Sequence, residues 1–189
     1  MFGIIQVEED DAVKRIKDWE ELTIQDNFLF QKVMRNKRLC QYLIKKILQI
    51  KIADITYPDT EKTIDIRLDS KSIRLDVYVK DNTGQVFDIE MQYTNEKENG
   101  LAKRTRYYQA MIDMDVLEKG DDYSKLNPAY IIFICTFDAF DQGLPMYTFR
   151  NRCVEQEGIE LNDEATKIFL NSKGDSPTLT QTCGHFCGT

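Results

Sequence analysis

The chain has 189 residues, of which 42% are hydrophobic and 30% charged, and its formal net charge is −7. This length suits one domain with a core of its own, and no stretch approaches the roughly 20 apolar residues of a membrane helix. The acidic N-terminus lacks a secretory signal, so we predict a cytoplasmic protein without membrane association. The net acidity argues against a plain nucleic-acid coating protein but permits a nuclease, whose metal-binding carboxylates add negative charge.

The two ends of the chain differ in composition from its middle. Residues 1–20 are strongly charged, and residues 175–189 are polar, small and unpatterned. We predict an N-terminal segment over 1–20, one domain over 21–174 and a poorly ordered tail over 175–189. Because the tail is unlike the rest, a truncated or frame-shifted product is one hypothesis. The five cysteines are an odd number and are expected to be reduced; Cys183, His185 and Cys187 lack the second pair that zinc sites usually have.

Helical periodicity begins at Asp26. Apolar residues recur at three- and four-residue steps to about Gln49, with Asp26 as N-cap and a break between two helices at Asn36. From about Ile52 the apolar period becomes two, which predicts an antiparallel meander with one apolar and one polar face through 63–68, 73–80 and 86–93.

The second half of the chain alternates between helix and strand. Asn95 and Glu98 resemble a capping box for a helix over 96–118 that stops at Gly120. Strands are predicted over 129–137, which is apolar throughout, and over 146–154 and 165–170. The order strand, helix, buried strand implies a right-handed crossover and a partly parallel sheet, so the predicted class is α/β with a mixed sheet.

The hairpin between residues 73 and 93 carries two opposed acids. A three-residue turn with Gly84 in the left-handed conformation pairs Asp81 with Gln85. Counting outward sets Asp76 opposite Glu90, with Cβ atoms roughly 5 Å apart, and Arg74 opposite Gln92.

Opposed carboxylates need compensation. A raised pKa, a neighbouring Arg74 or a divalent cation would each supply it. Oxygen ligands favour Mg²⁺ or Mn²⁺, with Gln92 one side chain further along. Asp88 lies on the same face and is either a metal ligand or a residue without a role in the site. The competing interpretation is that these residues form the solvated face of a sheet.

A basic cluster begins the following helix. Lys103, Arg104 and Arg106 precede Tyr108, and such a set beside a carboxylate platform suits contact with a DNA backbone. The alternative is a solvated helix face with Tyr108 in the core.

Four stretches in order, namely 22–34, 74–92, 104–109 and 120–128, resemble the recombination-promoting nuclease and transposase family of the PD-(D/E)xK superfamily. The resemblance implies a restriction-endonuclease-like mixed β-sheet flanked by helices, with Asp76 and Glu90 as metal ligands. Gln92 stands where the superfamily motif has lysine, so the site loses a point charge. Superfamily members often supply an acid from the first helix, and Asp26 is the candidate.

The function implied is a DNA endonuclease dependent on Mg²⁺ or Mn²⁺ that acts in recombination or on mobile elements, with Asp76, Glu90 and Gln92 as catalytic residues. The rivals are an inactive remnant that serves as a nucleic-acid or protein interaction module, and cleavage of RNA. A homodimer would suit cleavage of both strands of a duplex. No phosphate-binding glycine motif is present in the sequence, so no nucleotide cofactor is expected.

Overall fold

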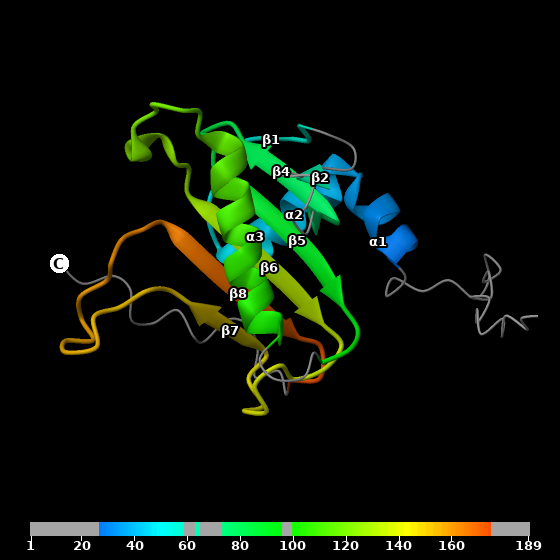
Figure 1. Ribbon diagram of the computed structural model, residues 1–189. Helices are drawn as coiled ribbons and strands as arrows, with labels where there is room; N and C mark the ends of the chain where they lie inside the picture. The colour runs from blue at the N-terminus through cyan, green and yellow to red at the C-terminus, as the bar shows by residue number, and fades with distance from the viewer. Residues whose placement is uncertain (1–26, 59–62, 65–72, 96–99, 175–189) are drawn as a thin grey trace, which may run out of the picture.

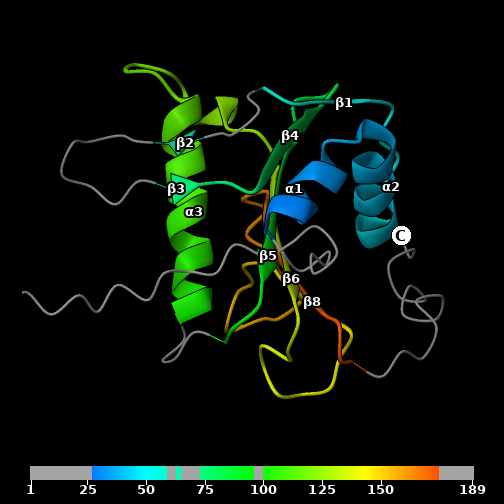
Figure 2. The same cartoon turned by 90° about the vertical axis from the view of Figure 1, so that its right-hand side faces the viewer.

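The protein was analysed as a computed structural model that describes residues 27–58, 63–64, 73–95 and 100–174. A six-stranded mixed sheet forms its middle layer, as the α/β prediction expected. Helix α3 (Gly100–Val116) crosses one face of the sheet, and the paired helices α1 (Asn27–Met34) and α2 (Lys37–Leu48) cover the other (Figures 1 and 2). The predicted segments 1–20 and 175–189 lie outside the described residues.

The break between α1 and α2 falls at Asn36, as predicted. The Asn36 side-chain oxygen accepts hydrogen bonds from the backbone N–H groups of Arg38 and Leu39, at 3.1 and 3.3 Å, and so caps α2. Gln49 ends the helix in the left-handed conformation (φ 56°) and donates its N–H to the Lys45 carbonyl. Asp26, the predicted cap of α1, lies outside the described residues.

The sheet has the order β1-β4-β5-β6-β8-β7. Strand β5 is parallel to β6 and β6 is parallel to β8, whereas the β1–β4, β4–β5 and β7–β8 pairs are antiparallel. A separate hairpin of two short strands, β2 and β3, lies on the α3 side (Figure 2). The strand bounds are β1 Ile55–Thr56, β2 Thr63–Ile64, β3 Ile73–Arg74, β4 Val77–Asp81, β5 Val86–Gln92, β6 Ala129–Cys135, β7 Met146–Phe149 and β8 Ala165–Asn171.

The turn between β4 and β5 has the predicted register. Asp81 donates its N–H to the Gln85 carbonyl at 3.0 Å, and Tyr78 pairs with Asp88. Gly84 has a φ of 93°, and a Cβ there would lie 3.0 Å from the Asn127 side-chain oxygen. Glycine therefore suits this turn both conformationally and sterically.

The strand before this turn is shorter than predicted. Its ladder with β5 begins at Val77, and β3 instead pairs with β2, so that Arg74 lies opposite Thr63. The prediction that Arg74 faces Gln92 was therefore wrong. The reason is a bend at residues 75–76: Leu75 packs on the α3 side of the sheet, whereas Val77 packs on the α1–α2 side.

Both faces of β5 are buried, so the competing interpretation of a solvated sheet face is wrong for this strand. Phe87, Ile89 and Met91 pack against α1 and α2, while Val86 packs under α3. Since side chains alternate along a strand, Asp88, Glu90 and Gln92 also point toward α3. Helix α3 thus converts what periodicity presents as a solvated face into a buried polar layer.

Helix α3 ends earlier than predicted, at Val116. Gly120 has the expected positive φ, 96°, but it lies in a turn beyond the helix rather than at its end. Glu98 of the predicted capping box lies outside the described residues. Strand β6 is the buried strand predicted after the helix, although it stops at Cys135.

Candidate active site

Strand β5 presents a buried row of polar side chains beneath α3. Asp88, Glu90 and Gln92 are only 0%, 1% and 7% exposed. Asp76 lies at the bend before β4 and is half-buried. Polar groups this deep are stable only when they are paired or neutralised, so their partners define what the site can do.

Asp76 and Glu90 are joined through backbone groups. The Asp76 N–H donates to Glu90 Oε1 at 2.8 Å, and the Met91 N–H donates to Asp76 Oδ2 at 3.2 Å. These two bonds hold the carboxyl groups next to each other at the end of the hairpin. The two acids therefore meet as the hairpin register predicts, although the bend removes Asp76 from the strand itself.

Helix α1 adds a residue that the sequence pattern did not indicate. Gln31 Nε2 donates to Asp76 Oδ1 at 3.3 Å, across 45 residues of chain. The family resemblance implied Asp26, five residues earlier, as the contribution of this helix. Gln31 directly follows buried Phe30 and lies about one turn before buried Met34, and only the docking of α1 on the sheet brings its side chain to the acids.

Arg104 closes the site from α3. Its guanidinium donates through Nη2 to Glu90 Oε2 and through Nη1 to Gln92 Oε1, both at 2.9 Å. The Tyr108 and Phe133 rings lie under it, with centroids 4.9 and 5.1 Å from Cζ. Arg104 thus provides a compensating positive charge, for which the sequence offered Arg74 as one of three possible means of compensation.

Gln92 is held in a fixed orientation. Its Nε2 donates to the Thr94 carbonyl at 2.7 Å, while its Oε1 accepts from Arg104. The amide oxygen therefore points toward the acids rather than away from them. An amide at this position offers an acceptor oxygen, unlike lysine, which only donates.

The acids are held partly neutral by their surroundings. Burial, together with the charge of Asp76, raises the pKa of Glu90 to about 7. Burial also raises the pKa of Asp76, and burial with the neighbouring Glu90 charge raises the pKa of Asp88 well above its ordinary value. Burial and the neighbouring carboxylate thus favour the protonated form of Asp88 by raising its pKa. Among the described residues, neither of its buried carboxyl oxygens has a hydrogen-bond partner.

These pKa shifts predict a pH dependence of stability. A carboxyl whose pKa is raised on folding binds its proton more tightly in the folded state, so the free energy of unfolding falls as pH rises. For Glu90 the window runs from its ordinary 4.5 to about 7. Without divalent metal, we expect a lower melting temperature at pH 8 than at pH 5.5.

Thermal melts in EDTA at both pH values check this expectation. Glu90→Gln is the matched variant, because glutamine keeps the shape of the side chain and cannot ionise. The difference in melting temperature between pH 5.5 and pH 8 should shrink in Glu90→Gln. A wild-type melting temperature that rises with pH over this range would contradict the expectation.

The remaining predicted residues fall into two groups. Lys103 and Arg106 are exposed on α3, flanking Arg104, and are accessible to a large ligand. Tyr108, predicted as a DNA contact, is 8% exposed and lies in the core beside Phe133, because its ring packs down onto the sheet. Its position agrees with the alternative interpretation, in which Tyr108 belongs to the hydrophobic core. From there its ring contacts the Arg104 guanidinium.

The ligand atoms that the site offers to a metal suit a small hard cation. Within the described part of the chain, no group of three His, Cys, Asp or Glu side chains is arranged to hold a metal. Asp76, Glu90 and Gln92 nevertheless supply only oxygen acceptors, and each acceptor oxygen keeps a second lone pair. Mg²⁺ commonly takes one or two carboxylates and fills its other positions with water. The residues therefore fit such an ion, provided that Arg104 shares or yields its acceptors.

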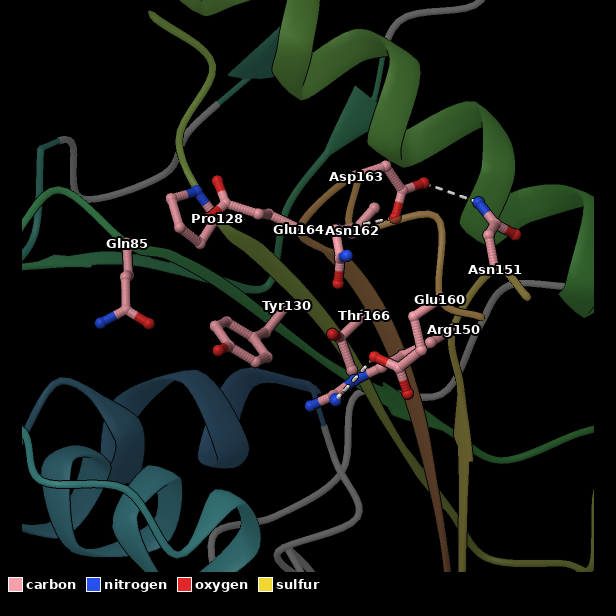
Figure 3. Close-up of a pocket in the computed structure, with 11 residues that line it drawn as sticks. Gln85, Pro128, Tyr130, Arg150, Asn151, Glu160, Asn162, Asp163, Glu164 and Thr166 are labelled. Atoms are coloured by element: carbon pink, nitrogen blue, oxygen red, sulfur yellow. Dashed lines mark hydrogen bonds and ion pairs between the residues drawn. The ribbon is translucent and has the colours of Figure 1, made fainter. Parts of the chain in front are cut away.

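A separate pocket of about 510 Å³ opens near the opposite ends of these strands (Figure 3). Arg150 and Arg152 pair with Glu160 at 3.7 and 2.9 Å, and Asn151 donates to Asp163 at 2.6 Å. Arg150 thus has an acidic partner within the lining, and the other charged lining residues, Asp163 and Glu164, are both acidic. The pocket contains none of the predicted site residues, and we place the candidate site at the acids. The lining comprises Gln85, Pro128, Tyr130, Arg150, Asn151, Glu160, Asn162, Asp163, Glu164, Ala165 and Thr166.

A mixed sheet with helices on both faces and an acid pair on a central hairpin defines the restriction-endonuclease-like class of α/β proteins. Comparison with known families is consistent with this class: the family model described as PD-(D/E)XK nuclease family transposase matches residues 27–173. The chain therefore belongs to the PD-(D/E)XK nuclease family transposases and carries their nuclease domain. No curated protein matches the sequence significantly. No helix in the described ranges is long and apolar enough to span a membrane.

Proposed function

We propose that this protein is a DNA endonuclease, dependent on Mg²⁺ or Mn²⁺, that hydrolyses phosphodiester bonds. It would act in the cytoplasm, in recombination or on mobile elements. The observation that carries the proposal is the pair Asp76–Glu90, held together by two backbone hydrogen bonds on the β4–β5 hairpin. Membership of a nuclease family with transposase members supports DNA as the substrate.

Each residue of the site has a role in this proposal. Asp76 and Glu90 would hold the ion, with the Gln92 carbonyl oxygen beside them. When bound, the ion polarises the phosphoryl oxygen and acidifies the attacking water. Gln31 orients Asp76, and the Thr94 carbonyl orients Gln92. Arg104, Lys103 and Arg106 all belong to α3 and would contact phosphates, which arginine binds through two parallel hydrogen bonds.

Nicking of supercoiled plasmid tests this function directly. Purified protein is incubated with plasmid in Mg²⁺, in Mn²⁺ and in EDTA, and the products are separated by electrophoresis. We expect nicked or linear DNA with metal and intact plasmid in EDTA. The same assay with single-stranded RNA distinguishes a ribonuclease. Folded protein that leaves the plasmid intact under both metals would overturn the proposal, whether or not it cleaves the RNA.

Replacing Gln92 by lysine tests the chemistry of the third position. In the general superfamily pattern a lysine there supplies a positive charge close to the reacting phosphate, so we expect Gln92→Lys to keep or raise cleavage activity. The new ammonium group would stand within reach of Arg104 and would repel it from the site. Initial rates of nicking of wild type and Gln92→Lys check this prediction, with Gln92→Met as the uncharged control of similar size. A tenfold or greater loss in Gln92→Lys alone would contradict it.

A specific observation favours a second candidate, a non-catalytic interaction module that keeps the nuclease fold. The acceptor oxygens of Asp76, Glu90 and Gln92 already have donors from the protein itself. A network in which these oxygens are all hydrogen-bonded is stable without a metal ion. This candidate predicts no cleavage and no rise in melting temperature with millimolar Mg²⁺ or Mn²⁺, whereas a metal-binding nuclease is stabilised by its ion.

A further inference from the structure

We infer that Arg104 is an internal counter-cation that occupies the acid site without metal and leaves it when a divalent ion binds, which makes metal binding and DNA binding cooperative. This inference rests on the proposed function of the same site. It assigns to one side chain two successive partners, Glu90 in the metal-free protein and a DNA phosphate in the metal-loaded protein.

The first step of the argument is the identity of the atoms that Arg104 binds. Its two terminal nitrogens donate hydrogen bonds to Glu90 Oε2 and Gln92 Oε1. The proposed function assigns these same oxygens to the ion. The Tyr108 and Phe133 rings lie within cation–π distance of the guanidinium. The arginine thus lies where a cation is needed in the metal-free protein, since Glu90 is 1% exposed and an unpaired charge there is strongly destabilising.

The second step is the repulsion between two cations. A divalent ion on Glu90 would lie next to the guanidinium in a poorly solvated region, where like charges interact strongly. The divalent ion and the Arg104 guanidinium therefore cannot both stay in direct contact with the Glu90 carboxylate without strong repulsion. Binding of the ion therefore favours a position of the Arg104 head group away from Glu90.

The third step decides which partner moves. The Arg104 side chain is 27% exposed, whereas Glu90 is 1% exposed and fixed on a central strand. A long arginine can keep its aliphatic part packed and extend its head group to solvent. Lys103 and Arg106 are exposed on the same helix, although their spacing from Arg104 does not put them on its face. They nevertheless add positive charge to the helix from which the displaced guanidinium would meet a phosphate backbone.

The functional consequence is reciprocal. A DNA phosphate offers Arg104 a bidentate partner outside the site and thereby lowers the competition for Glu90. By thermodynamic linkage, DNA strengthens metal binding by the same factor as metal strengthens DNA binding. The site would then be loaded with metal mainly when DNA is present.

The test measures Mn²⁺ affinity by electron paramagnetic resonance without DNA, in the full chain at pH 8.5. The variants are Arg104→Gln and the control Arg152→Gln, which removes another arginine–glutamate pair of the same 2.9 Å length, in the loop between β7 and β8. We expect Arg104→Gln to bind Mn²⁺ roughly tenfold more tightly than wild type, within the usual range of coupling between sites. Arg152→Gln should match wild type.

The outcomes separate this inference from the proposed function. If Arg104→Gln binds Mn²⁺ as tightly as wild type, or more weakly, the counter-cation role is overturned and the metal site still stands. No binding by either protein overturns the metal site itself, and the inference with it.

A second measurement avoids mutation, in case Arg104→Gln does not fold. Nuclear magnetic resonance of ¹⁵N-labelled wild type follows the Arg104 side-chain signals as Mg²⁺ is added. The restricted rotation of a paired guanidinium should be released as the Asp76 and Glu90 backbone signals shift. Unchanged Arg104 signals during that shift would overturn the inference.

Discussion

Replacing Asp76 by asparagine should reduce plasmid nicking by roughly 10³-fold while leaving the protein folded. The loss is large because the carboxylate is proposed to hold the ion, whose contribution to a hydrolytic transition state is several kcal/mol, and each ~1.4 kcal/mol is a factor of ten in rate. Asparagine keeps the size of the side chain, and its amide oxygen can still accept from the Met91 N–H. The rate of nicking in Mg²⁺ and in Mn²⁺ is the measurement.

The control for Asp76→Asn is Asp54→Asn. Asp54 is an exposed carboxylate that accepts a hydrogen bond from Lys37 at 2.7 Å, away from the acid pair. This variant removes the same charge and should keep the wild-type rate. Thermal melts of both variants in EDTA exclude unfolding as the cause of a loss. Full activity in folded Asp76→Asn would show that the acid pair is not the catalytic centre.

The largest effect on stability is expected from Phe133→Ala, which should lower the free energy of unfolding by about 3–5 kcal/mol. Phe133 is fully buried in the central strand β6. Its ring stacks on Phe169 at a centroid distance of 5.7 Å and lies 6.3 Å from the Tyr108 ring. Truncation opens a cavity among neighbours held by a sheet and a helix, which cannot easily collapse into it. Urea denaturation of wild type and variant gives the difference.

Phe149→Ala is the matched comparison for Phe133→Ala. Phe149 lies on the edge strand β7, is 43% exposed, and packs on Phe140 and Phe169. Removal of the same ring there should cost clearly less, because part of it already meets water. Equal losses from the two variants would show that α3 and the sheet do not form the well-packed layer that the site rests on.

The predicted function of the site is tied to this layer. Phe133 and Tyr108 form the apolar floor under Arg104, and Arg104 in turn holds Glu90 and Gln92. The packing of α3 on β6 therefore positions the charge that makes a buried acid pair tolerable. Phe133 in the hydrophobic core and Glu90 in the acid site are thus linked through Arg104.

Much of the local structure follows from the sequence alone. The period of two, interrupted by a three-residue turn with Gly84, determines the register that sets Tyr78 opposite Asp88, because a left-handed glycine allows few connections of this length. The helix break at Asn36 follows from the preference of its side chain for capping N–H groups. The mixed sheet follows from a helix between two strands, because a parallel pair needs a long crossover.

The tertiary structure decided what surrounds the acids. Periodicity shows which residues share a face, but it does not show what covers that face, and α3 buries Asp88, Glu90 and Gln92 on what looked like a solvated side. The bend at residues 75–76 sends β3 to a different partner strand, so Arg74 does not face Gln92. Gln31 and Arg104 reach the site from helices on opposite faces of the sheet. Such contacts depend on how distant segments pack, and a local pattern along the chain carries no record of that packing, whereas the hairpin and the helix cap depend only on neighbours in sequence.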